Sequence, residues 1–291
     1  MGFFKRCLAI SFLAFILYSV LATGFFFEII SEKNWLTEDF VAQNFPNRFY
    51  ADKEIRNGFL PLWNPHNFSG IPFQADIQTG VFYPFNLALS LFPQKELIDF
   101  FRLYQIQIIF HFILAAYFTF IFLRKLDLNF VSSFLGGAIY SFSGFFFSHA
   151  HHSNMVHSGI WLPAILYCCL KGFKDDFRWI WVCPFILSIS LFGGHPQMTL
   201  FIIYFFSLFY IFLSWRDSSH LGIHLLRFFM IVLTFFLLGA VQILPTAEFL
   251  NQTVRSSMDF SSAVTDSLPL NSLWTFLLPN WNLAEYQTWQ W

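Results

Sequence analysis

Charged side chains are scarce in this sequence of 291 residues, because Asp, Glu, Lys and Arg together make up only 11% of it. Soluble domains carry about 25% charged residues, so too few charges are present to cover a water-soluble globule of this size. A disordered chain is excluded as well, since disorder requires low hydrophobicity and high charge. The net charge of −1 gives no electrostatic basis for binding nucleic acid.

Cysteine is also rare. The sequence has four, at Cys7, Cys168, Cys169 and Cys183, and none of them forms a CxxC pair or a Cys/His metal-binding spacing. Cys168 and Cys169 lie inside an apolar run, where a thiol behaves as a small hydrophobic side chain. We therefore expect no disulfide framework.

Hydrophobic residues, by contrast, make up 56% of the sequence, and 45 residues are Phe. A membrane-spanning helix requires about 20 mostly apolar residues, because the hydrocarbon core of a bilayer is ~30 Å thick and an α-helix rises ~1.5 Å per residue. Seven stretches reach or nearly reach this length: 7–27, 103–123, 128–148, 153–170, 179–194, 196–215 and 228–247. The sequence therefore predicts an all-α, polytopic transmembrane helical bundle of about seven helices. Its first helix is expected to be retained, since the apolar run exceeds the ~7–15 residues of a signal peptide.

The distribution of charge predicts the orientation of the bundle, because cytoplasmic loops are enriched in Lys and Arg. With the N-terminus in the cytoplasm, the inside segments hold nine of the sixteen basic residues and only four of the seventeen acids. The nine are Lys5, Arg6, Arg124, Lys125, Lys171, Lys174, Arg178, Arg216 and Arg227. This orientation leaves an extracytoplasmic loop at 28–102 and an extracytoplasmic tail at 248–291.

The loop at 28–102 is expected to be partly helical. Thr37 is followed by Glu38 and Asp39, and acids favour the positive end of a helix dipole. Gly58 and Pro61 end this predicted helix.

Several segments of the chain, taken in order, resemble one family of membrane proteins. They are Glu38-Asp39-Phe40, GFLPLWNP at 58–65, GIPF at 70–73, Gln78, FYPFN at 82–86, WLP at 161–163, GHPQ at 194–197, QILPTAE at 242–248, Arg255-Ser256 and LLPN at 277–280. On these segments the chain resembles the YfhO family of bacterial membrane proteins, which is grouped with the GT-C type glycosyltransferases. Family members are usually longer, so 1–291 is expected to be a single membrane domain that forms the N-terminal part of a longer protein.

The resemblance implies an enzyme of the bacterial cytoplasmic membrane with its active site at the outer face. It implies transfer of a sugar from a lipid-linked, polyprenyl-phosphate donor to an envelope glycan or lipid acceptor, as in lipoteichoic acid glycosylation. Asp39, with Glu38 beside it, stands at the position of the family's catalytic acid. A carboxylate within hydrogen-bond reach can deprotonate the attacking hydroxyl.

Further residues are predicted to bind substrate. His195 and Gln197 belong to the GHPQ segment, whose backbone is constrained by its glycines and Pro196. Arg255 could hold a phosphate as a forked donor. These three join Glu248, Asn64 and Gln78 as the predicted substrate-binding set.

No metal site is predicted, and the cofactor stays unknown, with a divalent metal left open because none is strongly indicated. The cluster of His149, His151, His152 and His157 is interpreted as a polar turn at the membrane interface, since adjacent histidines on a helix do not face one point. Gln105, Gln107 and His111 are expected to point inward and join helices.

Two alternatives to an enzyme stay open. One is a transporter or lipid-translocating protein, although such proteins tend to contain inverted repeats, and the sequence reveals none. The other is an inactive fragment or an assembly partner of another membrane subunit.

Overall fold

The structure is a computed structural model that describes residues 2–92, 96–217, 220–257, 259, 264, 267, 270–276 and 278. The chain divides into two compact units, Met1–Ala247 and Glu248–Trp291, and each is described here by itself. The boundary falls at the predicted start of the tail. The described residues are mostly helical, and their β-type pairing is limited to an isolated antiparallel bridge between Asn64 and Ile71.

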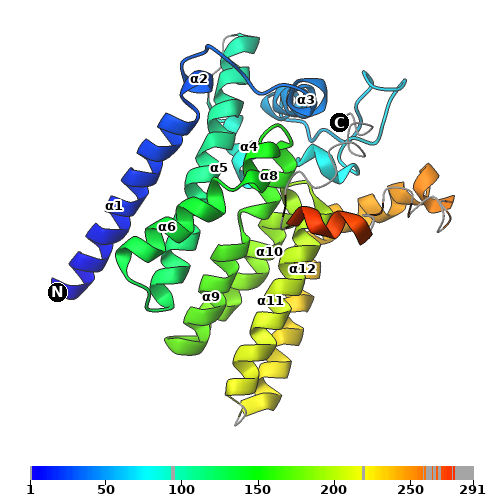
Figure 1. The fold of residues 1–291 in the computed structure, drawn as a ribbon. Helices are drawn as coiled ribbons and strands as arrows, with labels where there is room; N and C mark the ends of the chain where they lie inside the picture. The colour runs from blue at the N-terminus through cyan, green and yellow to red at the C-terminus, as the bar shows by residue number, and fades with distance from the viewer. Residues whose placement is uncertain are drawn as a thin grey trace. The chain divides into compact units, whose positions relative to one another are not determined.

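Most helices follow one another with short connections, and the longest described connection runs from Asn57 to Asp76, between α3 and η2 (Figure 1). In chain order they are α1 (Gly2–Phe25), α2 (Phe27–Ile30), η1 (Phe40–Asn44), α3 (Phe45–Arg56), η2 (Ile77–Thr79), α4 (Pro84–Leu89), α5 (Leu97–Lys125), α6 (Phe130–Ser141), α7 (Gly144–Ser148), α8 (Ser153–Gly159), α9 (Leu162–Lys174), η3 (Phe177–Val182), α10 (Cys183–Phe192), α11 (Pro196–Arg216) and α12 (Leu221–Leu250). The second unit contains η5 (Val254–Ser257) and η6 (Leu270–Phe276).

Six helical segments of the described chain are long and apolar enough to cross a membrane, which confirms the polytopic helical bundle. They are α1, α5, α6 with α7, α8 with α9, α11 and α12. The seventh predicted span is the shorter segment Phe177–Phe192. It consists of a 3₁₀-helix of 6 residues followed by an α-helix of 10. Because a 3₁₀-helix rises ~2.0 Å per residue, the segment is roughly 27 Å long.

Helix α5 lies at the centre of the first unit and contacts α1, α6, α8 and α9. Small residues permit close packing between membrane helices. At Gly137 of α6, a Cβ atom would lie 2.5 Å from the Ala116 carbonyl oxygen of α5, so only glycine fits there. On the other side of this contact, the Tyr18 hydroxyl of α1 donates to the Phe134 carbonyl at 2.9 Å.

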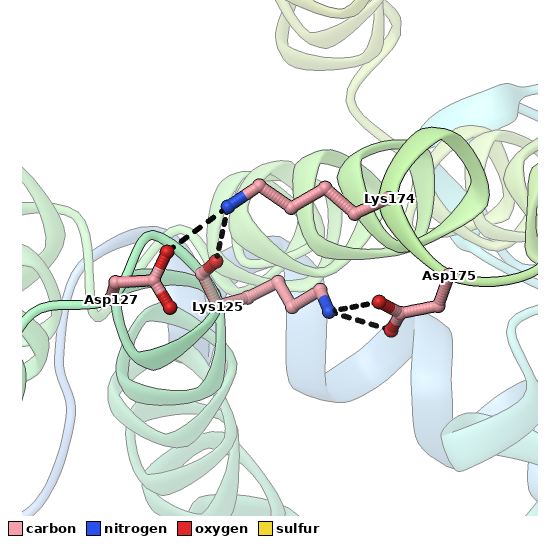
Figure 2. A network of polar contacts seen from close by, with 4 residues as sticks. All are labelled: Lys125, Asp127, Lys174 and Asp175. Atoms are coloured by element: carbon pink, nitrogen blue, oxygen red, sulfur yellow. Dashed lines mark hydrogen bonds and ion pairs between the residues drawn. The ribbon is translucent and has the colours of Figure 1, made fainter.

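A network of charges joins the ends of α5 and α9 (Figure 2). Lys125 Nζ lies 2.6 Å from both carboxylate oxygens of Asp175, and Lys174 Nζ lies 3.2 Å from Asp127 Oδ2 and from the Lys125 carbonyl oxygen. These residues belong to two of the short loops that the charge pattern assigns to the cytoplasm. Exposed ion pairs contribute only ~0–1 kcal/mol each, so the network aligns the helix ends more than it stabilises the fold.

At the opposite end of α5, the loop after α1 contains the predicted helix. It begins as the π-helix η1 and continues without a break into α3, with Pro46 in the first turn of α3. A proline fits at this position because the amide it lacks would have no partner inside the helix. The helix ends at Arg56, before Gly58 adopts a positive φ of 83°.

The same loop is bound to α12 by hydrogen bonds of its backbone and of the Gln74 side chain. Gln74 Nε2 donates to the Val241 carbonyl at 2.9 Å, and Gln242 Nε2 donates to the Gln74 carbonyl at 3.0 Å. Thr246 Oγ1 donates to the Ala75 carbonyl at 2.8 Å. A polar group inside a spanning helix requires a partner, and the loop backbone supplies it for the buried Gln242.

Candidate functional site

Two acid–histidine pairs stand where the loop after α1 meets α8. Asp39 Oδ2 lies 2.9 Å from His152 Nε2, and Glu38 Oε2 lies 3.1 Å from His151 Nε2. Both carboxylates are more than half exposed. The predicted catalytic acids are therefore reachable from solvent and are held in place by imidazoles.

The backbone explains how two adjacent histidines meet two adjacent acids. His151 and His152 lie in a turn that precedes α8, as the interpretation of a polar turn expects, and their ring centroids are 4.1 Å apart. Asn44 Nδ2 fixes this turn by donating to the His151 carbonyl at 3.1 Å. The interpretation of these two histidines as a simple interfacial turn missed their pairing with Glu38 and Asp39.

The surroundings of His152 favour the neutral form of its imidazole. Burial lowers its pKa, and the neighbouring His151 lowers it further, while Asp39 acts in the opposite direction. Its Nδ1 atom is buried and has no hydrogen-bond partner within the described residues. A neutral imidazole that donates from Nε2 to Asp39 has an acceptor lone pair at Nδ1. The pair can therefore orient the carboxylate and can take up a proton.

His195 and Gln78 lie at the same end of the bundle. His195 is the N-cap of α11, where its Nδ1 accepts from the Met198 amide at 3.3 Å. Burial lowers the pKa of His195, and His152 contributes to the shift because it lies within electrostatic range. Gln78 Oε1 accepts a hydrogen bond from Gln43 Nε2 at 2.8 Å. Gln43 belongs to η1 and lies one turn after Asp39. The structure thus brings both predicted residues to the surroundings of Asp39.

The other predicted residues are placed differently. Asn64 is buried and holds its own loop, because its Oδ1 accepts from the His66 amide and its backbone pairs with Ile71. Gln197 is exposed in the first turn of α11. Glu248 and Arg255 belong to the second unit. The side chain of Arg255 lies outside the described residues, and so do Leu277, Pro279 and Asn280 of the LLPN segment.

A groove of about 260 Å³ adjoins the Glu38–His151 pair. It runs between the end of α1, the chain before Glu38 and α7. Its lining residues are mostly apolar: Phe25, Phe26, Glu28, Ile29, Asn34, Trp35, Leu36, Thr37, Phe147, Ala150 and His151. An apolar chain could lie in this groove with a polar end at the paired acids.

A buried polar cluster lies further inside the bundle. The Tyr83 hydroxyl is 2.6 Å from His111 Nε2, and the Tyr104 hydroxyl is 2.7 Å from Ser153 Oγ. The His157 ring stacks on Tyr83 with centroids 4.8 Å apart. The prediction that His111 points inward is confirmed.

Gln105 and Gln107 also point inward, as predicted. Gln105 Oε1 accepts from the Leu36 amide at 2.9 Å, and Gln107 Nε2 donates to Asn86 Oδ1 at 3.1 Å. Both glutamines therefore join α5 to the loop that follows α1.

Arg48 is a buried residue of α3 that is not among the predicted site residues, and it is 1% exposed. The spacing of Asn44, Arg48 and Asp52 could have identified it, since residues four apart share one face of a helix. All three side chains are buried.

No group of three or more His, Cys, Asp or Glu side chains in the described chain is arranged to hold a metal ion. Comparisons of the chain with protein-family models, with curated proteins and with solved structures find no match. The fold and the site together define a multi-pass helical membrane protein with a carboxylate–histidine site at one end of its bundle. The resemblance to the YfhO family stays a prediction from sequence.

Proposed function

We propose that this chain is a membrane glycosyltransferase of the GT-C type, related to the YfhO family. It transfers a sugar from a polyprenyl-phosphate donor to a cell-envelope acceptor at the outer face of the bacterial cytoplasmic membrane. The observation that carries the proposal is the exposed Asp39–His152 pair beside a mostly apolar groove.

In the proposed reaction, Asp39 accepts the proton of the acceptor hydroxyl while that oxygen attacks the anomeric carbon of the sugar. The bond between the anomeric carbon and the phosphate oxygen breaks, and its electron pair leaves on the lipid phosphate. His152 orients Asp39 through its contact of 2.9 Å. General base catalysis of this kind contributes ~10²–10⁴-fold to a rate.

The surroundings of Asp39 support the proposed lipid-linked donor. The groove offers an apolar wall to the polyprenyl chain and ends at His151, next to the acids. His195 and Gln78 are the predicted substrate-binding residues with the best support, because both lie near this site.

Replacing Asp39 in cells that carry the full gene tests the function. The variant Asp39→Asn removes the base but keeps size and hydrogen bonding, so we expect the envelope sugar that depends on this gene to fall by about 100-fold or more. The matched control is Asp127→Asn, which removes an exposed acid paired with Lys174 at 3.2 Å. Mass spectrometry of envelope glycans and immunoblotting of membranes provide the readouts. Wild-type glycans in Asp39→Asn cells with normal protein levels would contradict the proposal.

A lipid-translocating protein is the second candidate, and the buried Tyr83–His111–His157 cluster favours it. Ionisable side chains inside a membrane bundle are typical of transport pathways. A translocase would move a labelled lipid phosphate across liposomes without forming a glycosidic bond, and Asp39→Asn would leave that movement intact.

A further inference from the structure

Arg48 is a buried cation without a hydrogen-bond partner. All three nitrogens of its guanidinium are buried, and none of them is hydrogen-bonded to any group in the described chain. Charged side chains are almost never fully buried unless they are paired. Burial lowers the pKa of Arg48 to about 10, which leaves the group charged at neutral pH.

The charges around Arg48 do not balance it. The nearby acid is Asp52, one turn along α3, but Asp52 Oδ2 already accepts a hydrogen bond from Arg56 Nε at 2.8 Å. Two arginines therefore share one carboxylate. The other groups within electrostatic range of Arg48 are Tyr104 and His157, which carry no negative charge at neutral pH. The interior keeps an excess of positive charge at this place.

This excess lies directly beside the candidate site. Asn44, one turn before Arg48 on the same helix face, binds the carbonyl of His151, whose side chain is paired with Glu38. On the inner side, the buried Nε2 atom of His157 also has no partner in the described chain. The Arg48 guanidinium and His157 Nε2 therefore lack hydrogen-bond partners within the described residues between α3, α5 and α8, and so does one acceptor atom, Asp52 Oδ1.

We infer that Arg48, with His157 and Tyr104 beside it, forms a buried anion site for a phosphoryl group. The planar guanidinium presents paired N–H donors that match two phosphate oxygens, and the Tyr104 hydroxyl and the His157 imidazole can contribute further donors. The apolar groove includes His151, whose carbonyl oxygen accepts from Asn44, and this groove favours a phosphate carried by a lipid. An inorganic phosphate offers the same oxygens. The site does not require that the chain transfers a sugar, so it stands or falls independently of the proposed function.

Ligand-dependent unfolding of the full chain in detergent micelles tests the site. The unfolding temperature is followed by tryptophan fluorescence with inorganic phosphate, with phosphatidic acid in mixed micelles, or with chloride at equal ionic strength. We expect a rise of several degrees with a phosphate probe and none with chloride, because a ligand that binds only the folded state stabilises it. A rise with phosphatidic acid alone identifies a lipid phosphate as the ligand, and a rise with both probes identifies free phosphate as sufficient. No rise with either probe overturns the inference.

Variants assign the effect to Arg48. Arg48→Met is expected to keep or raise the unfolding temperature without ligand, because it removes an unbalanced buried charge, and to lose the phosphate-induced rise. The matched control Arg102→Met removes an arginine that pairs with Glu32 at 2.5 Å on the exposed surface, and it should retain the rise.

If Arg48→Met does not fold, Arg48→Lys keeps the charge but loses the forked geometry, and the apparent affinity for phosphate should fall at least threefold. His157→Gln should weaken the effect as well. An unchanged phosphate response in Arg48→Lys and His157→Gln overturns the inference. An equal drop of the unfolding temperature without ligand in Arg48→Met and Asp52→Asn also overturns the inference, because it would make Arg48 a structural partner of Asp52.

Discussion

Replacing Gly193 by alanine tests the packing that positions the candidate site. Gly193 follows α10 in an ordinary right-handed conformation, with φ −58° and ψ −17°, so its backbone does not require glycine. Its surroundings do, because a Cβ atom at this position would lie 2.7 Å from the Ser158 amide nitrogen and 2.8 Å from the His157 carbonyl carbon. Both of these are backbone atoms of α8, which cannot rotate away.

The size of the effect follows from these distances. Non-bonded heavy atoms are at their best separation near 3.5–4.0 Å, so α8 and α10 would have to move apart by roughly 0.8 Å or more. Overpacking of this kind costs about 1–3 kcal/mol. Alanine also reduces the entropy of the unfolded chain, which returns about 0.4–1 kcal/mol. We expect Gly193→Ala to lower the free energy of unfolding by about 1–2 kcal/mol.

Denaturant unfolding in micelles, followed by tryptophan fluorescence, measures this change. The matched control is Gly24→Ala, since a Cβ atom at Gly24 meets no atom within 4 Å and the residue lies in the last turn of α1. That variant should gain about 0.5–1 kcal/mol, because alanine favours a helix over glycine. If Gly193→Ala is stabilised as much as Gly24→Ala, the close approach of α8 and α10 is refuted.

Two further predictions concern pH and the fastened loop. Burial lowers the pKa values of His152 and His195 below 6.5, so the unfolded chain binds protons more readily than the folded chain. The free energy of unfolding should therefore be highest above pH 6.5 and should fall as the pH drops below it. Unfolding at pH 7.5 and at pH 5.5 measures this fall, which should be smaller in His152→Gln. Gln242→Leu leaves the Gln74 carbonyl without its donor and should lower the free energy of unfolding by about 1–3 kcal/mol. The control Gln252→Leu, at an exposed position, should change it little in the same assay. Equal losses in the two variants would contradict the role of the hydrogen bonds between α12 and the loop.

The lengths of apolar runs predict which segments are helical but not where the helices end. The run 228–247 became α12, which extends over Leu221–Leu250, and the run 103–123 became α5, which begins at Leu97 with a capping box between Glu96 and Asp99. Single polar residues such as Asp99, His224 and Arg227 end an apolar run in the sequence, but the helix continues through them. The run 128–148 is divided into α6 and α7, because the helix is interrupted after Ser141.

The candidate site could be predicted only in part. Asp39 was accessible to sequence reasoning because it lies at the start of a predicted helix and at the position that the YfhO resemblance gives to a catalytic acid. Its partner His152 was not, since no periodic pattern relates two residues so far apart in the chain. The same limit applies to Gln242. The free-energy cost of a polar side chain inside a membrane helix was predictable, but its hydrogen-bond partner, the Gln74 carbonyl, was not.

The hydrogen bonds between α12 and the loop that follows α1 have a consequence for biosynthesis. The hydrogen bond from Gln74 to Val241 joins residues 167 positions apart, and a chain grows at ~5–20 residues per second. The loop therefore waits about 8–33 s after its own synthesis before α12 reaches it. During that interval the backbone carbonyls of Gln74 and Ala75 lack their partners on α12. The time at which α12 is made, more than the synthesis of the loop itself, therefore sets when this end of the bundle is completed.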